Sequence, residues 1–168
     1  RVLQDRPALA DDPALAAIGR EIERMGLYLE ELMSLSPGRA GQTRPLRREP
    51  ARLSELAESV LGILAGRLKH AQIRVRRSAP PDEPAAPVDA DQIRQAMMNL
   101  LINAIEASGP GGTISVAVER CGRRLRLSVA DEGPGVPADA GDVFDAFVTG
   151  RPNGVGLGLY LCRQIVTR

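Results

Sequence analysis

The sequence predicts an α+β fold, a two-layer α/β sandwich with helices on one face of a mixed sheet, preceded by a long coiled-coil-like helix. Two observations lead to it. Helical periodicity alternates with segments of strand-like apolar/polar alternation, and the elements follow in the order helix, helix, strand, strand, loop, helix. The chain has 168 residues, and its hydrophobic content of 43% is sufficient for a core.

The first segment is a narrow apolar seam whose members alternate three and four residues apart. They are Leu15, Ile18, Ile22, Met25, Leu29 and Leu32. This spacing predicts one long helix from about Pro13 to Leu35, ended by Pro37-Gly38, that packs against a partner helix. An amphipathic helix lying on the globular part is the alternative. The stretch SPGRAGQTRP has the composition of a linker.

The next elements follow from apolar periodicity and turn residues. RPLRRE predicts a short edge strand, and Pro50 then opens a helix. One apolar face runs along that helix: Leu53, Leu56, Ala57, Val60, Leu61, Leu64 and Leu68. IRVRRS alternates as a strand does, and APPDEPAAP is a proline-rich loop.

A further helix is predicted from about Asp91 to Ser108. Asp89 and Gln92 resemble a capping box at its start, and GPGG ends it. TISVAVER and RLRLSVAD then alternate as two strands joined by a turn at Cys121-Gly122-Arg123.

Four polar residues form a stripe on helix 91–108: Gln95, Asn99, Asn103 and Glu106. Asparagine is a poor helix former, so propensity does not explain its presence there. An amide oxygen is a suitable ligand for Mg²⁺, which keeps several waters and shares phosphate oxygens. A plain solvated stripe is the alternative interpretation.

Two glycine-rich stretches come next. In VADEGPGVP, Asp131 ends a strand and its carboxylate can accept a hydrogen bond from an exocyclic amine such as that of adenine, while Gly133 and Gly135 let a ring approach the backbone. A dinucleotide fingerprint is rejected because Pro137 and ADAGD do not open a helix. In GVGLGLYLC, glycines place unhindered N–H groups at a helix start, a natural anion site, although the P-loop pattern is absent.

The stretch AGDVFDAFVTGRPN, between these two, is long enough to act as a lid. We expect Arg151 to reach a terminal phosphate. Phe144 and Phe147 would anchor the lid. An exposed arginine and two core aromatics are the alternative. The single histidine, His70, is interpreted as a capped or surface residue. The sequence contains no zinc-binding or catalytic-nucleophile motif that would suggest a different function.

Composition excludes other classes of function. The 22 basic and 21 acidic residues give a net charge of +1, and aromatics make up 2%, which argues against nucleic-acid binding. No run of about twenty apolar residues and no signal peptide is visible. Cys121 and Cys162 show no metal-ligand spacing and are expected to be reduced, buried thiols. Because the sequence starts at Arg1, without methionine, we expect a fragment or a processed chain.

These motifs, in this order, resemble those of the ATP-binding catalytic domain of sensor histidine kinases, part of the GHKL group. NLLINAIEAS is similar to the family's N box, DEGPG to its first glycine box, VFDAFVTGR to its phenylalanine box and lid start, and GVGLGL to its second glycine box. The resemblance covers about Gln42 to Arg168. It implies that residues 41–168 are the catalytic domain without its C-terminal strands. Residues 1–40 would be a linker and the second helix of a dimerisation hairpin.

The resemblance also implies roles for single residues. Asn103 would hold Mg²⁺, Asp131 would recognise adenine, and Arg151 stands where close relatives carry a phosphate-facing lysine. The candidate catalytic residues are Asn99, Glu106 and Arg151. The candidate nucleotide-binding residues are Asn99, Asn103, Asp131, Gly133, Gly135, Phe144, Arg151, Gly154, Val155, Gly156, Leu157 and Gly158.

The implied function is transfer of the γ-phosphoryl group of Mg-ATP to a histidine outside this segment, for relay to the aspartate of a response regulator receiver domain. The expected parent is a cytoplasmic homodimer held by a four-helix bundle, with or without a membrane anchor. An ATP-driven clamp is an alternative, but clamps generally carry a water-activating glutamate at the position of Asn99. An anti-sigma-factor serine kinase, disfavoured by the seam helix, and a degenerate binding module are the others.

Overall fold

A computed structural model describes residues 45–138, 140–150 and 154–168, and Pro45–Arg168 form one compact unit. The predicted helix from Pro13 to Leu35 lies outside the described residues. The elements are β1 (Glu49–Ala51), α3 (Leu53–Ile63), α4 (Ala65–His70), β2 (Arg74–Ser78), β3 (Ala86–Val88), α5 (Ala90–Ser108), β4 (Thr113–Cys121), β5 (Arg124–Asp131) and α6 (Gly158–Val166).

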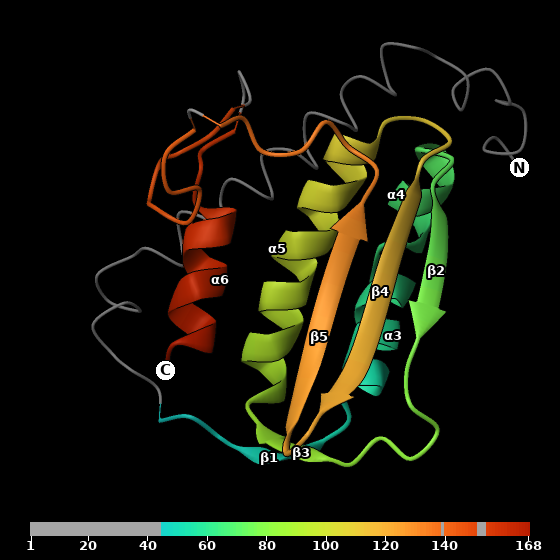
Figure 1. The fold of residues 1–168 in the computed structure, drawn as a ribbon, viewed down its shortest axis with the longest axis vertical. Coiled ribbons are helices and arrows are strands. Elements are labelled where there is room, and N and C mark those ends of the chain that lie inside the picture. Colours follow the sequence, from blue (N-terminus) through green and yellow to red (C-terminus); the bar gives the residue numbers. More distant parts are fainter. Residues whose placement is uncertain (1–44, 139, 151–153) are drawn as a thin grey trace, which may run out of the picture. The chain divides into compact units, whose positions relative to one another are not determined.

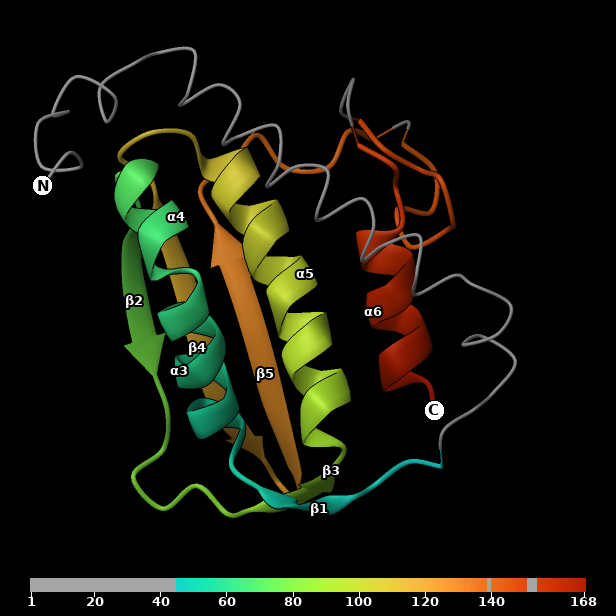
Figure 2. The ribbon, with the colours of Figure 1, turned by 180° about the vertical axis from the view of Figure 1, so that it is seen from behind.

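The main sheet has three strands in the order β2-β4-β5, with β2 parallel and β5 antiparallel to β4. Helices α3, α4 and α5 cover one face of this sheet, and α6 packs beside α5 (Figure 1 and Figure 2). The prediction of a mixed sheet with helices on one face is therefore confirmed. None of the helices in the described ranges is long and apolar enough to span a bilayer.

The core lies between the helices and the sheet. All seven residues of the apolar face predicted for residues 53–68 are buried, Leu64 at the junction of α3 and α4 included. From α5, Met97 and Leu101 pack in the same cluster as Ile114 of β4, and all three are at most 1% exposed. Burying a side chain of this size stabilises the fold by about 1.5–3 kcal/mol. The apolar periodicity thus correctly identified the core.

The predicted single helix over residues 50–68 is divided at Leu64, whose backbone has φ −84° and ψ 1°. Gly62 and Gly66 flank this point, and glycine has a low helix propensity. Leu64 still accepts a hydrogen bond from Leu68 N at 2.9 Å, so the apolar face continues across the break.

The chain enters α3 differently from the prediction. Pro50 lies in β1, opposite Pro87 of β3, and the helix begins only at Leu53. Proline lacks an N–H and its fixed φ suits an extended edge strand, so two prolines can face each other in this small ribbon. The predicted strand at RPLRRE is thus displaced to Glu49–Ala51, and the proline-rich loop ends in β3.

A distant carboxylate caps α3 in place of a local side chain. Arg52 at the N-cap position makes no side-chain cap hydrogen bond. Glu83, only 6% exposed, accepts hydrogen bonds through Oε1 from Leu53 N at 2.7 Å and Ser54 N at 3.2 Å. A carboxylate there also faces the positive end of the helix dipole. The proline-rich loop therefore fixes where α3 starts.

Candidate active site

Helix α5 carries the amide side chains singled out in the sequence. Asp89 fixes its first turn, because Oδ1 accepts from Gln92 N at 3.3 Å and Oδ2 from Arg47 N at 3.1 Å. This confirms Asp89 as the cap of the helix. Asn99 and Asn103 lie one turn apart in the middle of α5, and both are half-buried. They are therefore held on a rigid element and are partly accessible.

Asn99 connects α5 to the start of α6. Its Nδ2 donates to the carbonyl oxygen of Gly158, the first residue of α6, at 3.3 Å. One turn later the Cys162 thiol donates to the carbonyl oxygen of Ala96 at 3.4 Å. These two hydrogen bonds attach one face of α6 to α5, so the glycine-led end of α6 lies beside Asn99.

Asp131 is the last residue of β5, as predicted, and its side chain is exposed. Its Oδ1 accepts from Gly133 N at 2.9 Å. Gly133 packs so closely on the end of α5 that a Cβ there would lie 2.8 Å from Ala107 Cβ and 2.9 Å from Ala107 O. Glycine is required at this contact, which joins the acidic strand end to α5.

The glycine segment, residues 154–157 before α6, contacts the phenylalanine loop, which we define as residues 142–148. Gly156 has φ +74°, and a Cβ on it would lie 2.6 Å from the carbonyl carbon of Phe147. Phe147 N donates to Gly156 O at 2.9 Å. Leu157 is fully buried, whereas Gly154 and Val155 are half-buried and therefore partly accessible to a ligand.

The two phenylalanines of this loop are exposed rather than part of the core. Phe144 is 40% and Phe147 68% exposed, and Phe147 adopts a left-handed φ of +67°. Non-glycine residues rarely adopt this conformation, which costs about 1–3 kcal/mol. The interpretation of these residues as core aromatics is wrong, and they are available for contact with a ligand or another surface.

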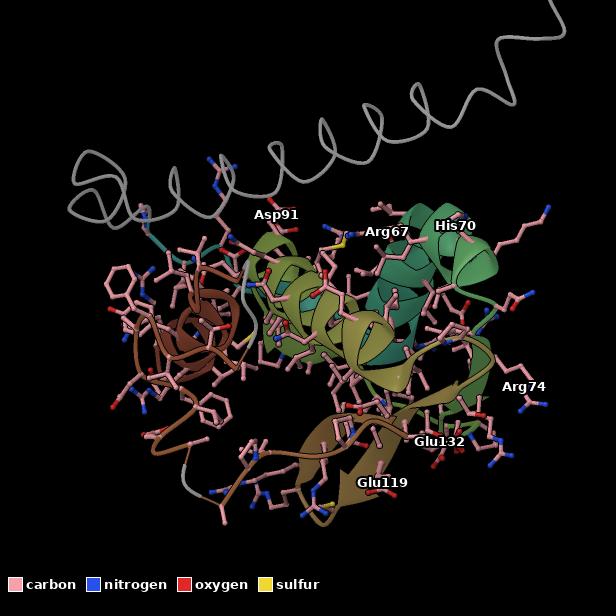
Figure 3. The ribbon with its side chains drawn as sticks, turned by 90° about the horizontal axis from the view of Figure 1, so that it is seen from above. Arg67, His70, Arg74, Asp91, Glu119 and Glu132 are labelled. Atoms are coloured by element: carbon pink, nitrogen blue, oxygen red, sulfur yellow. The ribbon has the colours of Figure 1, made fainter. Side chains whose placement is uncertain are left out.

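The remaining predicted site residues lie in different places. Glu106 is directed to α4, where its Oε1 lies 3.9 Å from Nη2 of Arg67. Arg67 itself lies on the side of α4 that faces α5 (Figure 3). Gly135, with φ +77°, is exposed beyond β5. Arg151 lies outside the described residues. His70 is exposed at the end of α4, as expected for a surface histidine.

The two cysteines differ, contrary to the prediction that both are buried. Cys162 is buried in α6, and burial raises the pKa of its thiol to about 11. Cys121 is exposed because it is the last residue of β4, where the hairpin turns. Both are free thiols.

We expect a thiol-reactive reagent at pH 8 to modify the exposed Cys121 of the native protein rapidly, and the buried Cys162 only after denaturation. With a pKa of about 11, only about one in a thousand Cys162 side chains is the reactive thiolate at this pH. Spectrophotometric counting of released thiolate, with Cys121→Ser as the control that removes the rapid phase, measures this. Two rapidly reacting thiols in native protein would contradict the buried position of Cys162.

Sequence reasoning missed two side chains next to these elements. Glu132 accepts from Thr113 N through Oε2 at 3.0 Å, at the end of the sheet where Arg74 also lies (Figure 3). Arg163 of α6 binds Asp142 and Asp145 of the phenylalanine loop. The sequence offered one signal for this ion pair: Asp142 and Asp145 are three residues apart, and the following helix contains one arginine, Arg163.

The sequence matches a known protein family over residues 88–168, that described as histidine kinase-, DNA gyrase B-, and HSP90-like ATPase. The chain is 33% identical over 153 residues to the adaptive-response sensory kinase SasA of Synechococcus sp. (strain JA-3-3Ab). That alignment covers 88% of this chain but 40% of SasA, so the chain spans less than half of this relative.

Solved structures of histidine kinases share the fold. The catalytic domain of histidine kinase ThkA superposes with a TM-score of 0.66 at 30% identity, covering 71% of this chain and 79% of that one. ThkA in complex with response regulator protein TrrA gives 0.71 at 27% identity, over 97% and 45% of the two chains. Full-length ShkA in complex with AMPPNP gives 0.74 at 26% identity, over 92% and 33%.

The motif order, the helix-covered mixed sheet and these likenesses agree. The chain belongs to the histidine kinase-, DNA gyrase B-, and HSP90-like ATPase family, and it carries the ATP-binding catalytic domain of a sensor histidine kinase.

Proposed function

We propose that this chain binds Mg-ATP and transfers the γ-phosphoryl group to a histidine outside this segment, from which it passes to the aspartate of a response regulator. The observation that carries the proposal is the meeting of two motifs on α5. Gly158 of the second glycine box bonds to Asn99, and Gly133 of the first packs on Ala107. Eight residues of helix separate these contacts by about 12 Å, a span of the order of an extended nucleoside triphosphate.

In this proposal, Asp131 recognises the base. Because Oδ1 already accepts from Gly133 N, the other carboxylate oxygen is left to accept from the exocyclic amine of adenine. A charged carboxylate forms a stronger hydrogen bond with this amine than a neutral carbonyl would. Gly135 leaves space for the ring beside the backbone, because a Cβ there would meet nothing within 4 Å, whereas Gly133 is occupied by its contact with Ala107.

The phosphates are proposed to lie at the start of α6, a helix of nine residues whose first N–H groups have no partner within the helix. The described residues contain no group of three or more His, Cys, Asp or Glu side chains suited to hold a metal alone. Mg²⁺ fits such a site, because it binds through one or two protein oxygens together with phosphates. The Asn103 amide oxygen is its proposed ligand, and the ion would neutralise developing phosphate charge.

The chemistry requires little from the protein beyond position and charge. A ring nitrogen of the acceptor histidine forms the new bond to the γ-phosphorus while the bond to the β–γ bridging oxygen breaks and ADP leaves. Asn99 is an amide, already bonded to Gly158 O, and cannot accept a proton from water. An ATP-hydrolysing clamp is therefore not proposed.

The ThkA–TrrA complex supports a receiver domain as partner of this chain. Dimerisation through the helix predicted from Pro13 to Leu35 belongs to the same proposal.

The function is tested with the chain, Mg-ATP carrying a γ-phosphate label, and an added helical hairpin that contains a phosphoacceptor histidine. We expect label on the hairpin that is stable in base and lost in acid, as a phosphoramidate is. Acid-stable label on serine would favour an anti-sigma-factor kinase, and release of free phosphate alone would favour a clamp; either result contradicts the proposal. A hairpin with the histidine replaced by alanine is the control.

A further inference from the structure

Arg163 of α6 binds two carboxylates of the phenylalanine loop at once. Its Nη1 lies 2.6 Å from Asp142 Oδ2 and its Nη2 lies 2.7 Å from Asp145 Oδ1. The arginine side chain is 35% exposed, and the two aspartates are 50% and 61% exposed. The planar fork of a guanidinium fixes the direction of both bonds, which a point charge such as that of lysine would not.

The two aspartates in turn define the backbone of the loop. Asp142 Oδ1 accepts from Phe144 N at 2.9 Å, and Asp142 O accepts from Asp145 N at 2.9 Å. The hydrogen bond from Phe144 N and the Arg163 side chain keep the pKa of Asp142 below its usual value, because both favour the charged carboxylate. At the other end of the loop, Phe147 N donates to Gly156 O at 2.9 Å. The loop is thus attached to α6 at one end and to the glycine segment at the other.

Helix α6 contacts both this loop and α5. Gly158 and Cys162, one turn apart, bond to α5, whereas Arg163 is the next residue around the helix and points to the loop. A shift of α6 relative to α5 would therefore move the loop, and a shift of the loop would act on the helix that is proposed to face the phosphates.

We infer that Arg163 is a positioning residue: from the last turn of α6 it couples the phenylalanine loop to the helix whose first turn is proposed to face the phosphates, and so raises the affinity for the triphosphate part of the nucleotide. The inference rests on the proposed function. Exposed ion pairs add little to global stability, so the effect of losing Arg163 should appear in triphosphate binding and not in unfolding. Adenosine lacks phosphates and would contact Asp131, so its affinity should not depend on the phenylalanine loop.

The experiment measures binding of Mg-ATP and of adenosine by calorimetry for the wild type and Arg163→Gln. We expect about a tenfold weaker Mg-ATP affinity with adenosine affinity and melting temperature unchanged. Arg163→Lys should lose less, because lysine can pair with one aspartate at a time. The double variant Asp142→Asn/Asp145→Asn should match Arg163→Gln, and combining all three changes should add nothing. Arg126→Gln, an exposed arginine 4.0 Å from Glu119, is the matched control.

Amide hydrogen exchange on the nucleotide-free protein gives an independent readout. Arg163→Gln should accelerate exchange at Phe144, Asp145 and Phe147, whose N–H groups the clamped loop orders. Equal losses of ATP and adenosine affinity, or unchanged ATP affinity despite faster exchange, would overturn the inference and leave the proposed function intact. A wild-type chain that binds no Mg-ATP would overturn both.

Discussion

Asp131→Asn is expected to weaken Mg-ATP binding by about tenfold to a hundredfold, while the protein remains folded. The remaining amide oxygen can still accept from Gly133 N, the bond that Asp131 Oδ1 makes at 2.9 Å. The other oxygen becomes an NH₂ donor, which would face the amine of adenine, another donor. The acceptor for the base is lost and a donor–donor contact replaces it.

Calorimetric titration of both proteins with Mg-ATP measures this effect. Asp82→Asn is the matched control, because it makes the same chemical change at a side chain that is 80% exposed and only 4.0 Å from Arg120. The control should bind as the wild type does. Unaltered binding by Asp131→Asn would remove this residue from the proposed site.

Gly156→Ala is expected to lower the free energy of unfolding by about 2–4 kcal/mol and to abolish measurable Mg-ATP binding. Gly156 has φ +74°, which an L side chain rarely adopts. A Cβ would also lie 2.6 Å from Phe147 C and 2.7 Å from Val148 O. Both atoms belong to the backbone, so the phenylalanine loop would have to move and the Phe147 N–Gly156 O bond would break.

Urea unfolding followed by circular dichroism, with calorimetry for nucleotide binding, measures both parts of this prediction. Gly62→Ala is the control. Gly62 lies within α3, and a Cβ there would meet nothing within 4 Å. The same substitution should therefore be neutral or stabilise by up to about 1 kcal/mol, because alanine favours the helix. If both variants lost equal stability, the close contact at Gly156 would not be the cause.

Local patterns predicted much of the fold. The apolar periodicity of residues 53–68 and the alternation of residues 113–131 reflect burial on one face, which recurs regularly along a helix or strand. The Asp89 cap and the glycine before α6 are likewise local, since each acts on backbone groups within a few residues. For these features the chain carries its own signal, and the structure agrees with it.

The sequence by itself therefore determined the class of fold, the core and the order of the nucleotide motifs, because periodicity and glycine placement are properties of neighbouring residues. Only the tertiary structure decided that Glu83 caps α3, that Pro50 faces Pro87, and that Arg163 binds Asp142 and Asp145. Helix α4 and strand β2 separate Glu83 and Pro87 from their partners in the sequence, and the glycine segment separates Arg163 from its own. Which charge meets which then depends on how the elements pack, and no local pattern records that.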